Sequence, residues 1–248
     1  MTMLIVKKFG GTSVADKEHI FNAARRCLED YHKGNDVVVV LSAMGKHTDE
    51  LIAQAKIINP NPSEREMDML LSIGEQMSVA FMAMAFEAMD VPAISLNAFQ
   101  AKIHTTNEYG NAKITNIETD RIQEELKQRK IVIVTGFQGI AENNDVTTLG
   151  RGGSDTTAVA LAAALNADAC EIYTDVDGVY TADPRKVSNA RKLAEISYDD
   201  MLHMALNGAE VLHSRCVEIA KKFNIPLVVR SSMNRAEGTV VRNREAVA

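Results

Sequence analysis

Two glycine-containing loops have residue types and spacing that suit anion binding. The first is Lys8-Phe9-Gly10-Gly11-Thr12-Ser13. Adjacent glycines let backbone N–H groups approach phosphate oxygens, a following helix turns its positive end toward them, and a lysine adds a point charge. The same residues also fit an ordinary tight strand–helix turn with a solvated lysine, so the loop alone leaves both interpretations open.

The second loop is Gly150-Arg151-Gly152-Gly153-Ser154-Asp155. Flexible backbone, a fork-shaped cation and a hydroxyl together form a good receptor for a carboxylate or a phosphate. The structural alternative is a glycine-rich turn in which Ser154 caps the next helix.

A third segment, from Thr174 to Arg185, is rich in acidic side chains and contains one aromatic ring, Tyr180. A carboxylate such as Asp175 or Asp183 can hold ribose hydroxyls, and a tyrosine ring can stack on a base. Asp and Gly are common in any turn, so this segment is a weak signal by itself.

The sequence lacks the motifs of several other classes of nucleotide-binding protein, hydrolase and metalloenzyme. A Walker loop would need glycine at position 40, which is Val40, and a nucleophile elbow would need glycine at 156, which is Thr156. No G-x-G-x-x-G follows a strand, and the six histidines show no metal-ligand spacing. His104, in a polar stretch, remains a candidate substrate contact. We therefore expect no metal site built from protein side chains.

The elements that must position these loops alternate between strand-length apolar runs and segments of helical period, which indicates an α/β fold with a mostly parallel sheet. We expect residues 100–115 to form a hairpin or lid. The strands are expected at 4–6, 37–41, 91–96, 131–135, 146–149, 169–174, 227–230 and 238–241, and the helices at 16–31, 48–58, 63–90, 117–127, 156–166, 198–207 and 210–223. Each of the three loops follows a strand, where ligands of open α/β sheets bind.

Composition sets the class of protein. The 248 residues are 46% hydrophobic and 24% charged, with a net charge of −6. An acidic chain lacks the positively charged surface that attracts nucleic acids and anionic membranes. No apolar run approaches the 18 residues that a membrane-spanning helix needs. Cys27, Cys170 and Cys216 stand far apart without a C-x-x-C motif, which suits a reducing compartment. We expect a cytoplasmic protein with no nucleic-acid or membrane partner.

Taken together, the segments resemble the catalytic domain of the aspartate kinases, within the amino-acid kinase family. The resemblance rests on five motifs in the family's order: the first loop, Leu41-Ser42-Ala43-Met44-Gly45, Gly74-Glu75, residues 148–155 and residues 173–185. It implies a three-layer α/β/α sandwich around a mostly parallel central sheet. It also implies ATP-dependent phosphorylation of the side-chain carboxylate of L-aspartate to 4-phospho-L-aspartate, the first step toward lysine, threonine and methionine.

The resemblance also implies the roles of individual residues. Lys8 and Asp155 would be catalytic, Arg151 would hold the α-carboxylate and Glu75 the α-ammonium of aspartate, and Mg²⁺ would be held mainly through the ATP phosphates. The residues expected at ATP are Lys8, Phe9, Gly10, Gly11, Ser42, Thr174, Asp175, Tyr180, Asp183 and Arg185. Those expected at aspartate are Thr48, Asp49, Glu50, Glu75, Arg151, Gly152, Gly153 and Ser154.

Residues 1–248 are expected to form one catalytic domain, with the N-terminal part mainly at the substrate and the C-terminal part mainly at the nucleotide. The family carries two regulatory ACT domains after this domain, and we expect none here. Glu210 stands where many relatives have an ATP-contacting lysine. By analogy the chain forms a homo-oligomer, such as a dimer, or associates with ACT domains. The alternatives are a kinase of the same family for glutamate, N-acetylglutamate, carbamate or a nucleotide, and a non-catalytic module that binds ATP or aspartate.

Overall fold

An eight-stranded sheet in the order β10-β12-β11-β9-β1-β2-β6-β3 runs through the centre of the computed structural model, which describes residues 2–183, 186–208 and 211–243. The strands from β11 to β3 in this order pair in parallel, and β12 runs antiparallel to β11. The strands are β1 (Leu4–Phe9), β2 (Asp36–Leu41), β3 (Ala93–Leu96), β6 (Ile131–Thr135), β9 (Ala169–Thr174), β10 (Glu195–Ile196), β11 (Leu227–Ser231) and β12 (Thr239–Val241).

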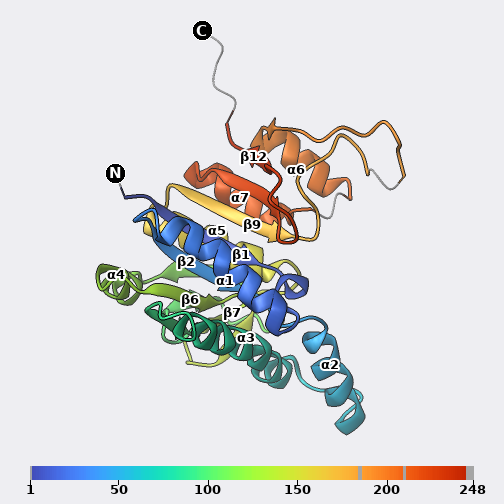
Figure 1. Cartoon of the computed structure of the whole chain (residues 1–248). Helices are drawn as coiled ribbons and strands as arrows, with labels where there is room; N and C mark the ends of the chain where they lie inside the picture. The colour runs from blue at the N-terminus through green and yellow to red at the C-terminus, as the bar shows by residue number, and fades with distance from the viewer. Residues whose placement is uncertain (1, 184–185, 209–210, 244–248) are drawn as a thin grey trace.

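Helices cover both faces of this sheet because its strands are apolar on both sides. Val38 and Val40 of β2 pack with α4, α5, α6 and α7, whereas Val37 and Val39 pack with α1 and α3. Figure 1 shows α1 and α3 together on the near side of the sheet. The helices are α1 (Lys17–Tyr31), α3 (Glu64–Glu87), α4 (Asp120–Lys127), α5 (Gly153–Leu165), α6 (Tyr198–Leu206) and α7 (Ser214–Phe223). The predicted three-layer α/β/α sandwich is confirmed.

A second, four-stranded sheet in the order β5-β4-β7-β8 joins one end of the sandwich. Its strands are β4 (Ile103–Thr105), β5 (Ile114–Ile117), β7 (Gln138–Ile140) and β8 (Val146–Thr148). The hairpin expected at 100–115 exists as the antiparallel pair β4–β5. The short helix α2 (His47–Ile58) projects from one corner of the molecule, and a 3-10 turn, η1 (Gly11–Val14), follows β1 (Figure 1).

Several predicted boundaries were wrong, for local reasons. β1 continues to Phe9 instead of ending at residue 6, because Lys7 finds buried partners on other elements. α5 begins at Gly153 instead of 156, after Gly152 adopts a left-handed conformation at the N-cap. Thr48 lies within the first turn of α2 and does not cap it, since the helix begins at His47. The short strands β7 and β10 were not predicted.

Among the helices of the described residues, α3 is the one whose length and composition would allow it to cross a membrane. Half of its most apolar stretch is buried inside the fold. Val79, Met82 and Phe86 pack against the sheet in the same core as α1. One side of α3 therefore belongs to the core, while Met69, Ile73, Phe81 and Met84 are exposed.

Candidate active site

Four neighbouring parallel strands end at one edge of the central sheet and bring their following residues together. Phe9 of β1 pairs with Tyr173 of β9 and with Leu41 of β2, which in turn pairs with Thr135 of β6. The residues that follow these four are Gly10, Thr174, Ser42 and Gly136. Backbone bonds hold the edge: Gly10 N donates to Tyr173 O at 3.3 Å and Gly136 N to Leu41 O at 2.9 Å. Segments far apart in the sequence thus form one continuous rim.

Lys8 lies one residue inside this rim and forms an ion pair with α5. Its Nζ is 2.7 Å from Asp155 Oδ1, and the two side chains are 11% and 14% exposed. Asp155 stands in the first turn of α5, where the helix dipole favours negative charge. A Cβ on Gly10 would lie 3.4 Å from Lys8 Nζ, so glycine leaves the ammonium open to a ligand. The pair combines a compact cation with a fixed carboxylate at the base of the rim.

Glu75 of α3 provides a second buried carboxyl group beside the rim. It is 3% exposed, and its Oε1 accepts the Ala43 N–H at 3.1 Å. Its Oε2 is buried and has no hydrogen-bond partner among the described residues. Burial raises the pKa of Glu75 to about 8, against the lowering effect of the Ala43 N–H. Such a carboxyl group is suited to receive a cation that enters the site.

The second glycine loop reaches the rim through α5. Gly150 and Gly152 have φ of +74° and +70°, values that glycine adopts without strain. Between them Arg151 is exposed and has no hydrogen-bond or ion-pair partner in the part of the chain that the structure describes. A Cβ on Gly136 would lie 2.6 Å from Ser154 Oγ, so the absence of a side chain at 136 is what admits that hydroxyl to the rim.

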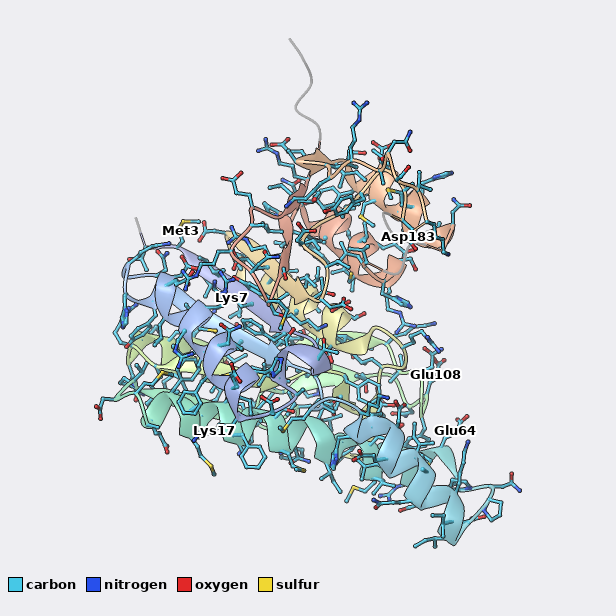
Figure 2. The ribbon with its side chains drawn as sticks, turned by 45° about the vertical axis from the view of Figure 1, so that its right-hand side comes forward. Met3, Lys7, Lys17, Glu64, Glu108 and Asp183 are labelled. Carbon is cyan, nitrogen blue, oxygen red and sulfur yellow. The ribbon has the colours of Figure 1, made fainter. Side chains whose placement is uncertain are left out.

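The loop after β9 lies at the β9 end of the rim, away from β6. Thr174 Oγ1 donates to Asp175 Oδ1 at 3.0 Å, and the Tyr180 hydroxyl donates to Asp177 Oδ1 at 2.9 Å. Lys192 lies 3.4 Å from the same Asp177 carboxylate, which ties the loop to the segment before β10. Asp183 lies farther along this loop, on the same side of the molecule as Glu108 of the β4–β5 loop (Figure 2). Predicted residues Arg185 and Glu210 lie outside the described residues.

Comparison with known proteins places this geometry in a family. A family model described as the amino acid kinase family matches residues 3–231. The chain belongs to the amino acid kinase family. An aspartokinase from Bacillus sp. (strain MGA3) is 60% identical over 238 residues, covering 96% of this chain and 58% of the relative. The chain therefore spans about three fifths of the length of that curated relative.

Solved structures agree with this family assignment. The aspartate kinase from Synechocystis is 50% identical, with a TM-score of 0.87, and the match covers 99% of this chain and 40% of that one. E. coli aspartokinase III, solved in complex with aspartate and ADP, is 32% identical with a TM-score of 0.85. That match covers 98% of this chain and 65% of the E. coli chain.

The structure also gives the surroundings of the remaining candidate residues. Phe9 is fully buried and stacks on Tyr173 with ring centroids 4.5 Å apart, so its backbone alone faces the rim. Thr48, Asp49 and Glu50 lie in the first turn of α2, where Asp49 and Glu50 are exposed. His104 Nε2 lies 2.9 Å from Glu118 Oε1 on the β4–β5 pair.

Other residues at the site of this family member were missed by sequence reasoning. Gly136 follows a buried strand at the same edge as Gly10, a position that could have identified it. The Thr135 hydroxyl is buried with no hydrogen-bond partner among the described residues, and nothing in the sequence marks it. Within the described ranges, no group of three or more His, Cys, Asp and Glu side chains is placed to hold a metal ion.

Proposed function

We propose that this chain carries the catalytic centre of an aspartate kinase, which transfers the γ-phosphoryl group of ATP to the side-chain carboxylate of L-aspartate. The products are ADP and 4-phospho-L-aspartate. The observation that carries the proposal is the Glu75 carboxyl group, which is buried beside a glycine-lined rim with one oxygen that has no hydrogen-bond partner among the described residues. An ammonium group is one ligand group that can satisfy it, and the exposed Arg151 guanidinium suits the carboxylate of the same ligand. The aspartokinase names of the relatives support the same substrate.

The amino-acid side of the site selects by charge. Arg151 provides a fork of N–H donors for the α-carboxylate, with Ser154 and the backbone of Gly152 and Gly153 beside it. Glu75 faces the α-ammonium, and its raised pKa falls when that cation arrives. Thr48, Asp49 and Glu50 would close the α2 side. Selection of a free amino acid requires both signs of charge, and this side of the rim offers both.

The nucleotide side is formed by the rim glycines and the loop after β9. Gly10, Gly11, Ser42 and the Phe9 backbone would meet the phosphates, and Thr174, Asp175, Tyr180, Asp183 and Arg185 the nucleoside. In this proposal both ligands draw residues from both parts of the chain: the nucleoside is held by residues 174–185, whereas the phosphates meet residues 9–11 and Ser42.

The attacking group requires no general base, because a carboxylate is already ionised at pH 7. One of its oxygens forms a bond to the γ-phosphorus while the bond from that phosphorus to the β–γ bridging oxygen breaks, and ADP leaves. The tasks left to the protein are in-line placement and cancellation of repulsion between anions. Lys8 neutralises charge on the phosphoryl oxygens, the rim N–H groups supply fixed dipoles, and Asp155 keeps the ammonium in place.

Mg²⁺ belongs to this proposal through the ATP phosphates. The carboxylate of Asp155 and the hydroxyl of Ser42 offer oxygen donors of the type that Mg²⁺ prefers. When bound, the ion would neutralise charge on the phosphate oxygens.

The direct test is ADP release coupled to a spectroscopic readout, with Mg²⁺-ATP and a panel of acceptors: L-aspartate, L-glutamate, N-acetyl-L-glutamate, carbamate and UMP. Hydroxylamine added to the reaction traps an acyl phosphate as a hydroxamate and identifies the product class. We expect turnover with L-aspartate and a trapped hydroxamate. Faster turnover of another acceptor would assign a different kinase of the family, and aspartate binding without turnover would indicate a binding module.

A further inference from the structure

Arg215, the second residue of α7, reaches from the nucleotide part of the chain to two groups beside the second glycine loop. Its Nη1 donates to Leu149 O at 2.9 Å and its Nη2 donates to Asn111 Oδ1 at 2.9 Å. Leu149 immediately precedes Gly150, and Asn111 belongs to the loop 106–113 between β4 and β5. The planar guanidinium therefore joins three segments that are 38 or more residues apart in sequence.

The glycine loop is confined between these segments. A Cβ on Gly150 would lie 3.0 Å from Gly110 O and 3.3 Å from Asn111 Oδ1. On the other side, a Cβ on Gly152 would lie 2.5 Å from the ring of His213, which precedes α7. Arg151 stands between these two glycines. The contacts that set its backbone position thus come from the 106–113 loop and from the start of α7.

The 106–113 loop is itself anchored to the substrate part of the chain. Gly110 N donates to Asp68 Oδ2 at 2.9 Å and Ala112 N to Thr148 O at 2.9 Å. Asp68, which is buried on α3, also accepts from Thr148 N at 2.8 Å. The loop therefore provides a fixed acceptor in Asn111, and Arg215 attaches α7 to it (Figure 2 shows Glu108 of this loop near Glu64 at the start of α3).

We propose that Arg215 is a positioning residue for the amino-acid side of the site. It fixes the Leu149 carbonyl and the Asn111 side chain together, and so holds the Gly150–Gly152 turn in the conformation that presents Arg151 to the substrate carboxylate. This inference rests on the proposed function, because it names a residue through which that binding side is held. Arg215 itself touches no reacting atom.

The first experiment uses the unliganded chain, so that its result does not depend on the reaction. Hydrogen exchange is compared between the unsubstituted chain, Arg215→Ala and Lys221→Ala, the last being an exposed cation on the same helix that pairs with Asp199. We expect Arg215→Ala to raise exchange about tenfold or more in residues 109–113 and 149–154, because a hydrogen bond from a charged donor is lost. Lys221→Ala should leave both segments unchanged. Equal protection in Arg215→Ala and the unsubstituted chain would overturn the proposal.

The second experiment measures the KM for aspartate, the KM for ATP and kcat. Arg215→Ala should raise the aspartate KM about tenfold or more and leave the ATP KM within about twofold. The aspartate KM of Arg215→Lys should lie between those of the unsubstituted chain and Arg215→Ala, because one ammonium cannot donate to both acceptors as the guanidinium does. The double variant Arg215→Ala/Asn111→Ala should add little to Arg215→Ala. An equal rise in both KM values would overturn the positioning role.

The two experiments separate the two proposals. If no acceptor is phosphorylated by the unsubstituted chain, the proposed function fails, and the exchange experiment still decides whether Arg215 holds the loop. If aspartate is phosphorylated and Arg215→Ala changes neither exchange nor the aspartate KM, the role of Arg215 alone is wrong.

Discussion

Lys7 and Lys8 are adjacent in sequence, yet their ammonium groups lie on opposite faces of the sheet. Side chains alternate along a strand, so Lys8 turns with Val6 toward α5, and Lys7 turns toward α1. Lys7 is 1% exposed and lies 2.7 Å from both Asp30 and Glu171. Burial alone would lower its pKa, but Glu171 and Asp30 raise the pKa above its usual value. The alternation of side chains along β1 thus directs Lys8 to the proposed ligand side and Lys7 to the interior.

Removal of the Lys8 ammonium should abolish most activity without unfolding the chain. We expect Lys8→Ala to lower kcat about 10²–10³-fold, the loss typical of one preorganised group at a reacting centre. The measurement is steady-state ADP release at saturating aspartate and ATP, with circular dichroism to verify the fold. Lys102→Ala removes an exposed lysine paired with Glu118 and should retain activity. A near-normal kcat for Lys8→Ala would remove Lys8 from the mechanism.

The raised pKa of Glu75 predicts a pH-dependent stability. Between pH 4.5 and about 8 the folded chain keeps a proton on Glu75 that the unfolded chain has lost, so this group's contribution falls as the pH rises. The slope is on the order of 1 kcal/mol per pH unit at most. Glutamine carries no proton that is released in this range, so Glu75→Gln should not lose stability as the pH rises. The Tm of the variant minus that of the unsubstituted chain should therefore increase from pH 5 to 8. Thermal unfolding across this range checks the trend.

Exposed Glu124 of α4 provides the matched control, because no histidine pairs with it among the described residues, and Glu124→Gln should show no pH-dependent difference in Tm. A Tm difference for Glu75→Gln that stays constant from pH 5 to 8 would show that Glu75 is ionised in the empty site.

At the scale of elements, the start of α5 depends on a turn that no other residue type fits. Gly152 has φ +70° and lies against His213, whereas Gly34 has φ +89° and no described atom within 4 Å of where its Cβ would be. Both alanine variants carry the backbone strain of about 1–2 kcal/mol. Gly152→Ala also displaces the His213 ring, which should add about 1–3 kcal/mol of destabilisation. The free energies of unfolding of the two variants, measured in urea, separate the backbone strain from the steric clash with His213. Equal losses of stability would mean that the His213 ring moves away without cost.

The regular elements were predictable because their patterns are local. β2 and β6 are uninterrupted apolar runs, and the loops after the strands carry glycine and charged residues at the edge where parallel strands end. The extension of β1 through Lys7 was not predictable, since its partner Glu171 lies 164 residues away. The role of Tyr173 was not predictable either. It begins the 173–185 motif that the resemblance assigns to the nucleotide, but its ring stacks on Phe9 in the core.

The sequence names the charged residues of the proposed site, whose roles stay predictions, but it does not reveal the contacts that orient them. Lys8, Glu75, Arg151 and Asp155 were all identified from motif and resemblance. The contacts that orient them depend on pairs such as Gly136 with Ser154, and Arg215 with Asn111. Neither pair is close in sequence or marked by composition, so no local pattern could reveal it.

At the scale of the whole molecule, the proposed function assigns the two ligands to different segments around the rim, so each ligand should protect its own segments. In hydrogen exchange, a non-hydrolysable ATP analogue should slow residues 10–13 and 174–183, because these follow β1 and β9 at the rim. L-Aspartate should slow residues 43–45 and 149–155, which contain Ala43 and the second glycine loop. Stronger protection of 174–183 than of 149–155 by aspartate alone would reverse the assignment.

The central position of β1 determines when this rim can exist during synthesis. One neighbour of β1 is β2, made soon afterwards, but the other is β9, which begins at Ala169. Until β9 emerges from the ribosome, β1 is an open edge, Lys7 lacks Glu171, and the Gly10 N–H lacks the Tyr173 carbonyl. Such long-range pairing is slow, and an unpaired apolar edge invites aggregation. A nascent chain that stalls before residue 169 therefore already holds Glu75 and Arg151, yet has no completed edge on which ATP can bind.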